Sequence, residues 1–480
     1  MLKLFKRHQP RKVFVVGLDC APPAVLFQTS AENRLGLKEQ LPTLSRLMDE
    51  GIYGPLSSSI PCITVPAWTS MVSSKDPGVL GFYGFRNRAD YSYDRMTIAT
   101  ANAIHEKRVW DVLSEVDKTS IAVGVPQTYP VQPLKGHMIS CFLTPSTDRQ
   151  YTYPHELRYE IERVLDGRPY DVDVPQFRTE DKSFLLWQIQ EMTEKRFAVI
   201  KYLLREKPWD FFMFVEIGLD RIHHGMWKLW DVEHPRHEPG NPYQDSIPEY
   251  YRYLDREVGE LLGMLDDDTV VLVVSDHGAK AMQGGFAINE WFRREGLLVL
   301  KEGPQYEGLV PFEKVEVDWE KTTAWGAGGY YARVFLNVEG REPQGKIPAQ
   351  DYEKVRDQVK EMIEAIPDDQ GKPMGSVVFK PEELYREVRN VPPDLMVYFG
   401  DLRWRAVGSF GLPDLYTFEN DIGPDDANHD QHGVFILWDP RRNHGGRTVE
   451  GLQLMDVAPT VLDLMGVRVP PDMQGKVVRR

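Results

Sequence analysis

The sequence is poor in cysteine and has no long apolar run. Only three cysteines occur in 480 residues, Cys20, Cys62 and Cys141, and none of them belongs to a CxxC pair. This scarcity fits a reducing compartment and excludes a disulfide scaffold or a metal site built from several thiolates. No stretch of about 18 consecutive apolar residues occurs, so we expect no membrane-spanning helix.

The sequence also has fewer basic than acidic residues. The chain has 57 Lys and Arg against 72 Asp and Glu, a formal net charge of −15, which argues against nonspecific binding to nucleic acid or to anionic membranes. Residues 1–12 are basic but lead directly into VFVVGLD, without the apolar stretch of a signal peptide. We therefore expect a cytoplasmic protein with a small-molecule substrate and with neither nucleic acid nor membrane as a partner. The oligomeric state is left open.

The composition is that of an ordinary globular protein, with 42% hydrophobic and 27% charged residues. Residues 13–18, 211–215 and 270–274 are continuous apolar runs typical of buried parallel strands, and helical patterns at 184–204 and 250–265 separate them. This alternation predicts an α/β fold with a mostly parallel central sheet and helices on both faces. Ligands of such sheets bind beyond the carboxyl ends of the strands.

The middle of the chain follows a different pattern. Strand-like residues 331–338, helical residues 352–366 and a return rich in Pro and Gly predict an inserted α+β subdomain over 301–410 that shapes the substrate pocket. Residues 1–300 and 411–480 then form the α/β core, which an apolar strand at 434–438 and a helix at 455–465 complete.

Carboxylates and histidines follow all three core strands. The candidates are Asp19, the pair Asp220 and His224, the pair Asp276 and His277, and a later pair, His429 and His432. Asp220 and His224 are four residues apart, which places them on one side of a helical turn, and we expect Gly278 to supply the turn that lets Asp276 and His277 converge. Singly, each could be a helix cap, a solvated helix face or a turn. Together at strand ends they favour a metal site, and the mixture of carboxylate and imidazole suits zinc, manganese or iron.

A hydroxyl-rich segment, SSSIPCITVPAWTSMVSS, contains a candidate nucleophile. Thr64 lies between Pro61 and Pro66, on a stiffened turn that could open a helix at Ala67. A metal ion can activate such a hydroxyl, and the amino end of a helix favours a phosphoryl group. Without the metal ligands, a simple capping role for Thr64 would be preferred.

These motifs, in their order along the chain, resemble the alkaline phosphatase superfamily and, within it, the type I phosphodiesterase and nucleotide pyrophosphatase branch. The similar segments are GLDCAPP, PCITVPAW, DRIHH, SDHG, NHDQHGVFILWDP and MDVAPTVLDLMG. The resemblance implies two divalent metal ions, usually zinc, with manganese or iron as alternatives. It implies that Asp19, Thr64, Asp276 and His277 hold one ion. Asp220, His224 and a late histidine hold the other, with His429 preferred over His432.

The resemblance also implies a two-step hydrolysis of phosphodiester or pyrophosphate bonds, in nucleotide-type or other small diesters, through a phosphothreonine at Thr64. Phe85 occupies the position of the asparagine that contacts a phosphoryl oxygen in nucleotide pyrophosphatases, so Arg86 or Asn87 is the candidate replacement. Trp227 is a candidate for stacking on a nucleotide base.

Other functions within the same superfamily are weighed against this one. CITVP lacks the C/S-x-P-x-R sequence of sulfatases, and phosphoglycerate mutases use a serine nucleophile and a different ligand set. A phosphomonoesterase and a phosphonoacetate hydrolase-like enzyme stay as alternatives. A noncatalytic metal-binding scaffold is disfavoured because every ligand position and Thr64 are filled.

Overall fold

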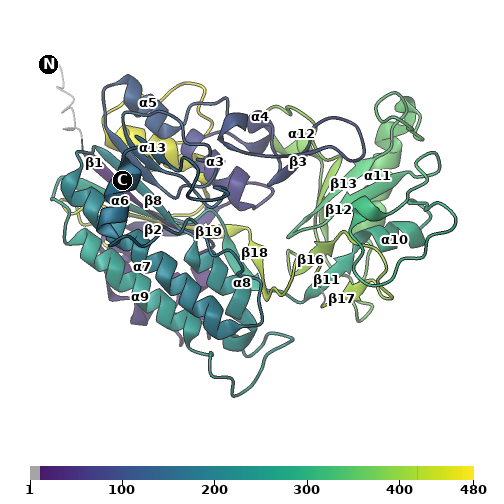
Figure 1. The fold of residues 1–480 in the computed structure, drawn as a ribbon, viewed down its shortest axis with the longest axis horizontal. Coiled ribbons are helices and arrows are strands. Elements are labelled where there is room, and N and C mark those ends of the chain that lie inside the picture. Colours follow the sequence, from purple (N-terminus) through teal and green to yellow (C-terminus); the bar gives the residue numbers. More distant parts are fainter. Residues whose placement is uncertain (1–10, 419, 480) are drawn as a thin grey trace.

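A computed structural model describes residues 11–418 and 420–479, and the basic residues 1–10 lie outside this range. Figure 1 shows a larger lobe built around one extended sheet and a smaller lobe, coloured mainly green, that lies beside it. The first strand, β1, and the last helix, α13, both belong to the larger lobe.

The central sheet has ten strands, nine of them in the order β20-β2-β19-β9-β1-β8-β5-β6-β7, with β21 paired to β2. β1 pairs in parallel with both β9 and β8, and β19 is antiparallel to its neighbours. The strands are β1 (Lys12–Leu18), β2 (Ile52–Ser57), β5 (Ser120–Val123), β6 (Gly136–Ile139), β7 (Thr152–Tyr153), β8 (Phe211–Glu216), β9 (Thr269–Val274), β19 (His432–Trp438), β20 (Arg447–Thr448) and β21 (Leu452–Gln453).

Apolar side chains on both faces explain why the central strands are continuous hydrophobic runs. Along β1, Phe14 and Val16 pack into one core cluster, whereas Val13 and Val15 pack into the other. Because successive side chains of a strand point to opposite faces and both sets are apolar, each face of the sheet must be covered by a layer of helices.

Helices supply those two layers, as Figure 1 shows for the long α7, α8 and α9 on one face and α3, α5 and α13 on the other. The helices of the larger lobe are α1 (Pro23–Leu26), α2 (Pro42–Glu50), α3 (Thr64–Ser73), α4 (Pro77–Leu80), α5 (Val109–Glu115), α6 (Leu157–Val164), α7 (Lys182–Glu206), α8 (Gly218–Trp230), α9 (Ser246–Leu262) and α13 (Val457–Leu464).

The smaller lobe has a core of its own and two sheets, of order β12-β13-β15-β14 and β16-β11-β17. Its elements are β11 (Gly284–Ala287), α10 (Ile288–Arg294), β12 (Ala324–Ala327), β13 (Ala332–Leu336), α11 (Tyr352–Glu364), β14 (Val377–Phe379), α12 (Pro381–Leu384), β15 (Leu395–Tyr398), β16 (Trp404–Val407) and β17 (Tyr416–Thr417). Because β11 and β17 pair with each other, the smaller lobe extends beyond the predicted insertion of residues 301–410 at both ends.

Two short two-stranded sheets lie outside these arrangements. One pairs β3 (Arg86–Arg88) with β4 (Met96–Ile98), and the other pairs β10 (Gly278–Ala281) with β18 (Ala427–Asp430). The second ribbon joins the two chain segments that lead into and out of the smaller lobe.

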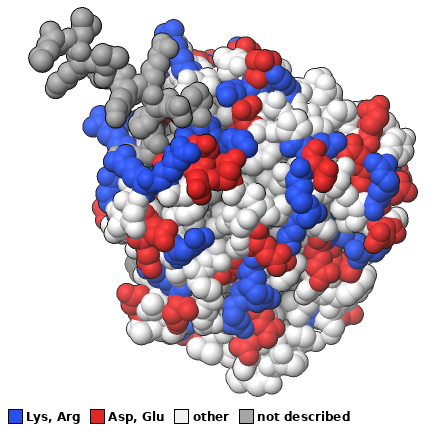
Figure 2. Space-filling view, turned by 90° about the vertical axis from the view of Figure 1, so that its left-hand side faces the viewer, with Lys and Arg blue, Asp and Glu red and all other residues white. Residues whose placement is uncertain are grey.

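The predicted α/β class with a mostly parallel sheet and helices on both faces is confirmed. Among the described residues, no helix combines the length and the apolar character that crossing a membrane requires. Figure 2 shows that Lys and Arg alternate with Asp and Glu on the side of the larger lobe turned away from the smaller one.

Candidate active site

The predicted ligands meet where β1, β8 and β9 end. Leu18 lies opposite Glu216 of β8, and Gly17 lies opposite Val274 of β9, so the three strands end at nearly the same level of the sheet. Asp19 directly follows β1, and Asp276 follows β9 by two residues. Parallel strands therefore deliver side chains that are distant in sequence to one buried site.

Four residues form what we call the sheet-edge half of the site: Asp19, Thr64, Asp276 and His277. His277 Nε2 lies 3.1 Å from Asp276 Oδ2 and 3.8 Å from Asp19 Oδ1. Thr64 Oγ1 lies 3.3 Å from the same nitrogen. Thr64 is the first residue of α3, three residues earlier than the predicted helix start.

Three residues form what we call the helix half: Asp220, His224 and His429. Asp220 and His224 lie one turn apart on α8, with Asp220 Oδ1 3.2 Å from His224 Nε2 and 3.9 Å from His429 Nε2. His429 lies on β18, and its ring stacks on that of His277 at 3.7 Å between centroids. The alternative, His432, is exposed at the start of β19.

The two halves form one continuous cluster whose donor set fits divalent cations. Ligand atoms of Asp19, Asp276 and His277 lie within 4.8 Å of one another, as do those of Asp220, His277 and His429. Among the described residues, four buried atoms of the cluster have no hydrogen-bond partner: Asp19 Oδ1, Asp220 Oδ1, His224 Nε2 and Asp276 Oδ2. Buried polar atoms are rarely left unpaired, and cations bound in the two halves would satisfy all four.

Electrostatics in the cluster lead to the same conclusion. Burial, together with repulsion from Asp276 and Asp220, raises the pKa of Asp19 well above its ordinary value. Burial lowers the pKa of His277, but the adjacent Asp276 together with Asp19 and Asp220 outweighs this effect and raises the pKa to about 9. Crowded carboxylates that hold extra protons are what a metal site shows before the cation replaces those protons.

Residues that sequence reasoning missed surround His224. Its Nδ1 lies 2.8 Å from Asp425 Oδ1, which directs Nε2 toward Asp220. Tyr330, from the smaller lobe, stacks on the His224 ring at 4.7 Å and donates its hydroxyl to Asp425 Oδ2 at 3.0 Å. Arg178 donates to that hydroxyl at 2.6 Å and lies 3.3 Å from Asp425. Burial raises the pKa of Asp425, but His224 together with Arg178 and Arg405 outweighs this effect and lowers the pKa to about 2.

A further missed residue, Trp68, holds Asp19. Trp68 lies one helical turn after Thr64 on α3, and its indole N–H donates to Asp19 Oδ2 at 2.7 Å. The spacing of four residues from Thr64 was a signal in the sequence. No comparable signal marked Asp425, Tyr330 or Arg178, because their contacts join segments that are remote along the chain.

The predicted substrate contacts are placed less favourably. The side chain of Asn87 accepts from the Tyr83 amide at 2.7 Å and donates to the Gly84 carbonyl at 2.9 Å. Its amide group is therefore already used in hydrogen bonds within the loop that precedes it. Arg86 is exposed. A contact of either residue with a phosphoryl group stays a prediction.

The stacking role predicted for Trp227 is wrong. This side chain is 1% exposed, its ring packs against Trp230 and His223, and its indole N–H donates to Asp231. A residue of α8 that points into the core has no face left for a base. Its position in an aromatic-rich segment did not distinguish core packing from a pocket wall.

The role predicted for Gly278 also needs correction. Gly278 is the first residue of β10 and does not have a positive φ. A Cβ atom there would lie 2.3 Å from the His432 carbonyl oxygen. Glycine is therefore required by close backbone approach between β10 and β19, and not by a turn.

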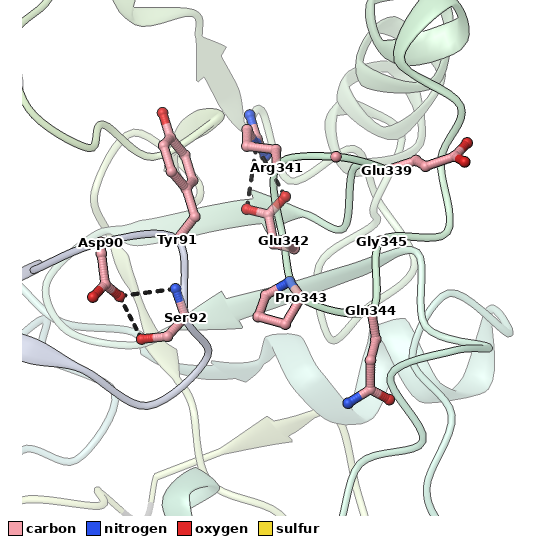
Figure 3. A pocket seen from close by; sticks show the side chains of 10 residues that line it. Asp90, Tyr91, Ser92, Glu339, Arg341, Glu342, Pro343, Gln344 and Gly345 are labelled. Atoms are coloured by element: carbon pink, nitrogen blue, oxygen red, sulfur yellow. Dashed lines mark hydrogen bonds and ion pairs between the residues drawn. The ribbon is translucent and has the colours of Figure 1, made fainter.

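A cavity of about 550 Å³ lies between residues 90–92 and 339–345. Figure 3 shows Asp90 bonded to Ser92 and Arg341 paired with Glu342, whereas the Glu339 side chain points away from them. None of the predicted site residues is among the described residues that line it. This cavity is therefore distinct from the carboxylate and histidine cluster.

Comparisons with known proteins concern the family and the fold of the chain. The family model described as type I phosphodiesterase / nucleotide pyrophosphatase matches residues 13–426. No curated protein matches the sequence.

Three solved structures illustrate the shared fold. Human ectonucleotide pyrophosphatase/phosphodiesterase 5 is 12% identical and has a TM-score of 0.55, with 97% of each chain covered. An inactive form of the murine protein in complex with AMP is 14% identical, with a TM-score of 0.53 and 96% of each chain covered. Phosphonoacetate hydrolase from Sinorhizobium meliloti 1021 in complex with phosphonoacetate is 14% identical, with a TM-score of 0.59 and coverage of 95% of this chain and 96% of that one.

Proposed function

Because this chain belongs to the type I phosphodiesterase / nucleotide pyrophosphatase family, whose members are phosphoric ester hydrolases, we propose that it hydrolyses small phosphate diesters or pyrophosphates with Thr64 as the nucleophile. The observation that carries the proposal is the position of Thr64 Oγ1, 3.3 Å from His277 at the edge of the buried cluster. Proteins of similar fold in complex with AMP and with phosphonoacetate support a small phosphate or phosphonate compound as substrate.

The cluster would hold two divalent cations, with zinc as our choice. Asp19, Thr64, Asp276 and His277 would bind one, and Asp220, His224 and His429 the other. When bound, such ions supply Lewis-acid chemistry that polarises a phosphoryl group and makes a hydroxyl more nucleophilic.

The chain itself positions the reacting groups. Thr64 begins α3, and because the first amides of a helix have no intrahelical acceptor, they attract phosphoryl oxygens. Trp68, one turn further along, fixes the orientation of the Asp19 carboxylate beside Thr64. Thr64 Oγ1 would form a bond to phosphorus as the leaving alcohol or phosphate departs, and water would then hydrolyse the phosphothreonine and restore the hydroxyl.

Hydrolysis of bis-p-nitrophenyl phosphate and p-nitrophenyl phosphate by the zinc-loaded protein tests this proposal. We expect the diester to be the better substrate, the Thr64→Ala variant to be inactive and Thr64→Ser to retain part of the activity. Unchanged turnover by Thr64→Ala would contradict a phosphothreonine mechanism.

The same assay separates the alternatives. A preference for the monoester would assign a phosphomonoesterase, and release of phosphate from phosphonoacetate alone would assign a phosphonate hydrolase. Inactivity on all three compounds in protein that has bound zinc would favour a noncatalytic scaffold.

The compartment is part of the proposal. All three cysteines are free thiols, and all three are buried. A protein whose cysteines form no disulfide fits the cytoplasm, where thiols stay reduced.

A further inference from the structure

Cys20 has a backbone conformation that its side chain does not favour. It directly follows Asp19, is fully buried and has a φ of +67°. The conformation lets its N–H donate to Asp276 Oδ1 at 3.2 Å, and the next amide, of Ala21, donates to Ser275 Oγ at 2.8 Å. Glycine would satisfy both backbone bonds without strain, so these bonds do not explain why a cysteine is present.

The thiol faces the helix half of the cluster. Cys20 Sγ, a carboxylate oxygen of Asp220 and a ring nitrogen of His224 all lie within 4.8 Å of one another, and all three residues are buried. In the absence of a cation the S–H group donates to the Gly278 carbonyl oxygen at 3.4 Å, a bond that a metal–sulfur bond would replace. A strained backbone thus holds a soft donor atom beside two predicted metal ligands.

The neighbouring atoms supply an independent observation. Asp220 Oδ1 and His224 Nε2 are buried and lack a hydrogen-bond partner among the described residues. His224 Nδ1 is already engaged by Asp425, so Nε2 is the nitrogen left for a ligand. Both unpaired atoms belong to the group that contains the sulfur.

We propose that Cys20 is a thiolate ligand of the cation that Asp220 and His224 hold. The sulfur–metal bond would form as the S–H bond breaks, with the proton released to solvent. Catalytic zinc expands to five ligands, so a fourth protein ligand beside His429 leaves room for a substrate oxygen. Thiolate ligands favour zinc over manganese or magnesium, so Cys20 would make the helix half selective for zinc.

This inference rests on the proposed function in one respect, that a metal ion binds in the helix half. Cobalt(II) is a suitable probe, because its visible bands report binding and a near-ultraviolet band reports a bond to sulfur. The variants are Cys20→Gly, which also relieves the strain at φ +67°, and Cys20→Ser, which preserves the shape of the side chain. Cys141→Ala is the matched control, because Cys141 is an equally buried free thiol that belongs to none of the ligand groups found among the described residues.

We expect the wild type and Cys141→Ala to show both bands, and both Cys20 variants to keep the visible bands and lose the near-ultraviolet one. Visible bands without a sulfur band in the wild type, or a sulfur band that persists in Cys20→Gly, would overturn the role of Cys20 and leave the proposed function intact. Failure of the wild type to bind cobalt or zinc would overturn both.

X-ray absorption of the zinc-loaded protein gives a second readout. We expect a zinc–sulfur distance of about 2.3 Å in the wild type and only the shorter nitrogen and oxygen distances of about 2.0–2.2 Å in Cys20→Gly. The same substitution should lower the affinity for zinc and leave that for manganese unchanged. Identical zinc spectra for the two proteins would contradict the proposal.

Discussion

The two halves of the cluster are held in place by different means. In the sheet-edge half, Asp19 and Asp276 follow directly from strands β1 and β9, deep in the central sheet. In the helix half, His224 is oriented by Asp425, which in turn bonds to Tyr330 and Arg178. The first half therefore depends mainly on backbone pairing, and the second on side chains that reach it from elsewhere, Tyr330 from the smaller lobe and Arg178 from the segment before α7.

This difference indicates where the site can be adjusted. A strand end in a buried parallel sheet cannot move without breaking many backbone hydrogen bonds. A histidine held through a chain of side-chain hydrogen bonds can be retuned by a single substitution. The helix half is thus the part in which affinity for the ion can be changed without disturbing the fold.

Asp425→Asn is expected to produce the largest difference in zinc affinity between the two halves of the cluster. The amide preserves the shape but removes the charge that holds His224, and loss of such a partner weakens metal affinity about 10- to 100-fold. Zinc titration followed by calorimetry should show one weakened site and one unchanged site. Asp394→Asn is the control, because Asp394 is also a buried carboxylate that pairs with an arginine and a tyrosine, Arg341 and Tyr352, but makes no hydrogen bond or ion pair with the cluster among the described residues. Equal weakening of both sites would show that the halves are not independent.

The corresponding test in the sheet-edge half is Trp68→Phe. Asp19 loses its indole donor, and because both groups are buried, we expect the free energy of unfolding to fall by about 2 kcal/mol more than in the control. Trp110→Phe is a matched control, because Trp110 is equally buried and its indole N–H has no partner among the described residues. Urea denaturation measures the difference. If the two variants lose equal stability, the bond to Asp19 contributes nothing.

A smaller effect is expected for Tyr330→Phe. The ring still stacks on His224, but the hydroxyl that links Arg178 to Asp425 is lost. We expect the affinity of the helix half for zinc to fall roughly fivefold, which corresponds to about 1 kcal/mol. Tyr331→Phe removes the neighbouring hydroxyl, which bonds to Tyr83 away from the cluster, and should leave zinc binding unchanged. A loss of zinc affinity as large as that expected for Asp425→Asn would mean that Tyr330 itself orients His224.

The stability of the segment that carries Asp425 should also depend on pH. His234 donates from Nε2 to the Asp426 carbonyl at 3.0 Å and accepts from the Arg236 amide at Nδ1, so it is held neutral. Burial lowers its pKa to about 4 from an ordinary value of 6.5. The unfolded chain thus binds the proton first as pH falls from 6.5, so the folded state loses stability down to about pH 4 and is unaffected above 6.5.

The His234→Gln variant should lack this contribution. We expect the difference in unfolding free energy between wild type and variant to decrease between about pH 6.5 and pH 4 and to be constant at higher pH, as measured by urea denaturation. A difference that does not depend on pH would show that His234 does not titrate as its surroundings indicate.

The sequence was sufficient for the fold class and for most of the cluster, for an identifiable reason. The strands that precede Asp19, Asp220 and Asp276 are buried on both faces, so their apolar runs are unmistakable and their ends mark the site. The resemblance preferred His429 over His432, and of the two histidines the structure brings His429 into the cluster. Ala279 of β10 pairs with His429 of β18, and this short ribbon turns one histidine inward and leaves the other exposed.

Side-chain networks that join remote segments could not be predicted from the sequence. Asp425 and Tyr330 are 95 residues apart, and no periodic pattern connects them. Trp227 shows the opposite failure, since an aromatic residue in a polar segment gave no sign that its ring faces the core. Hydrophobic periodicity therefore located the strands, whereas the partners of polar side chains depended on how the segments pack.

The β10–β18 ribbon has a consequence for how such chains diversify. It closes the long excursion of residues 282–426 next to the cluster, with Ala281 opposite Ala427. Each doubling in length of a flexible loop closed in this way costs only about 0.6 kcal/mol of chain entropy. Evolution can thus lengthen, shorten or replace the excursion while the ribbon keeps His429 beside His277. Contacts such as Tyr330 on His224 then limit which replacements preserve the chemistry.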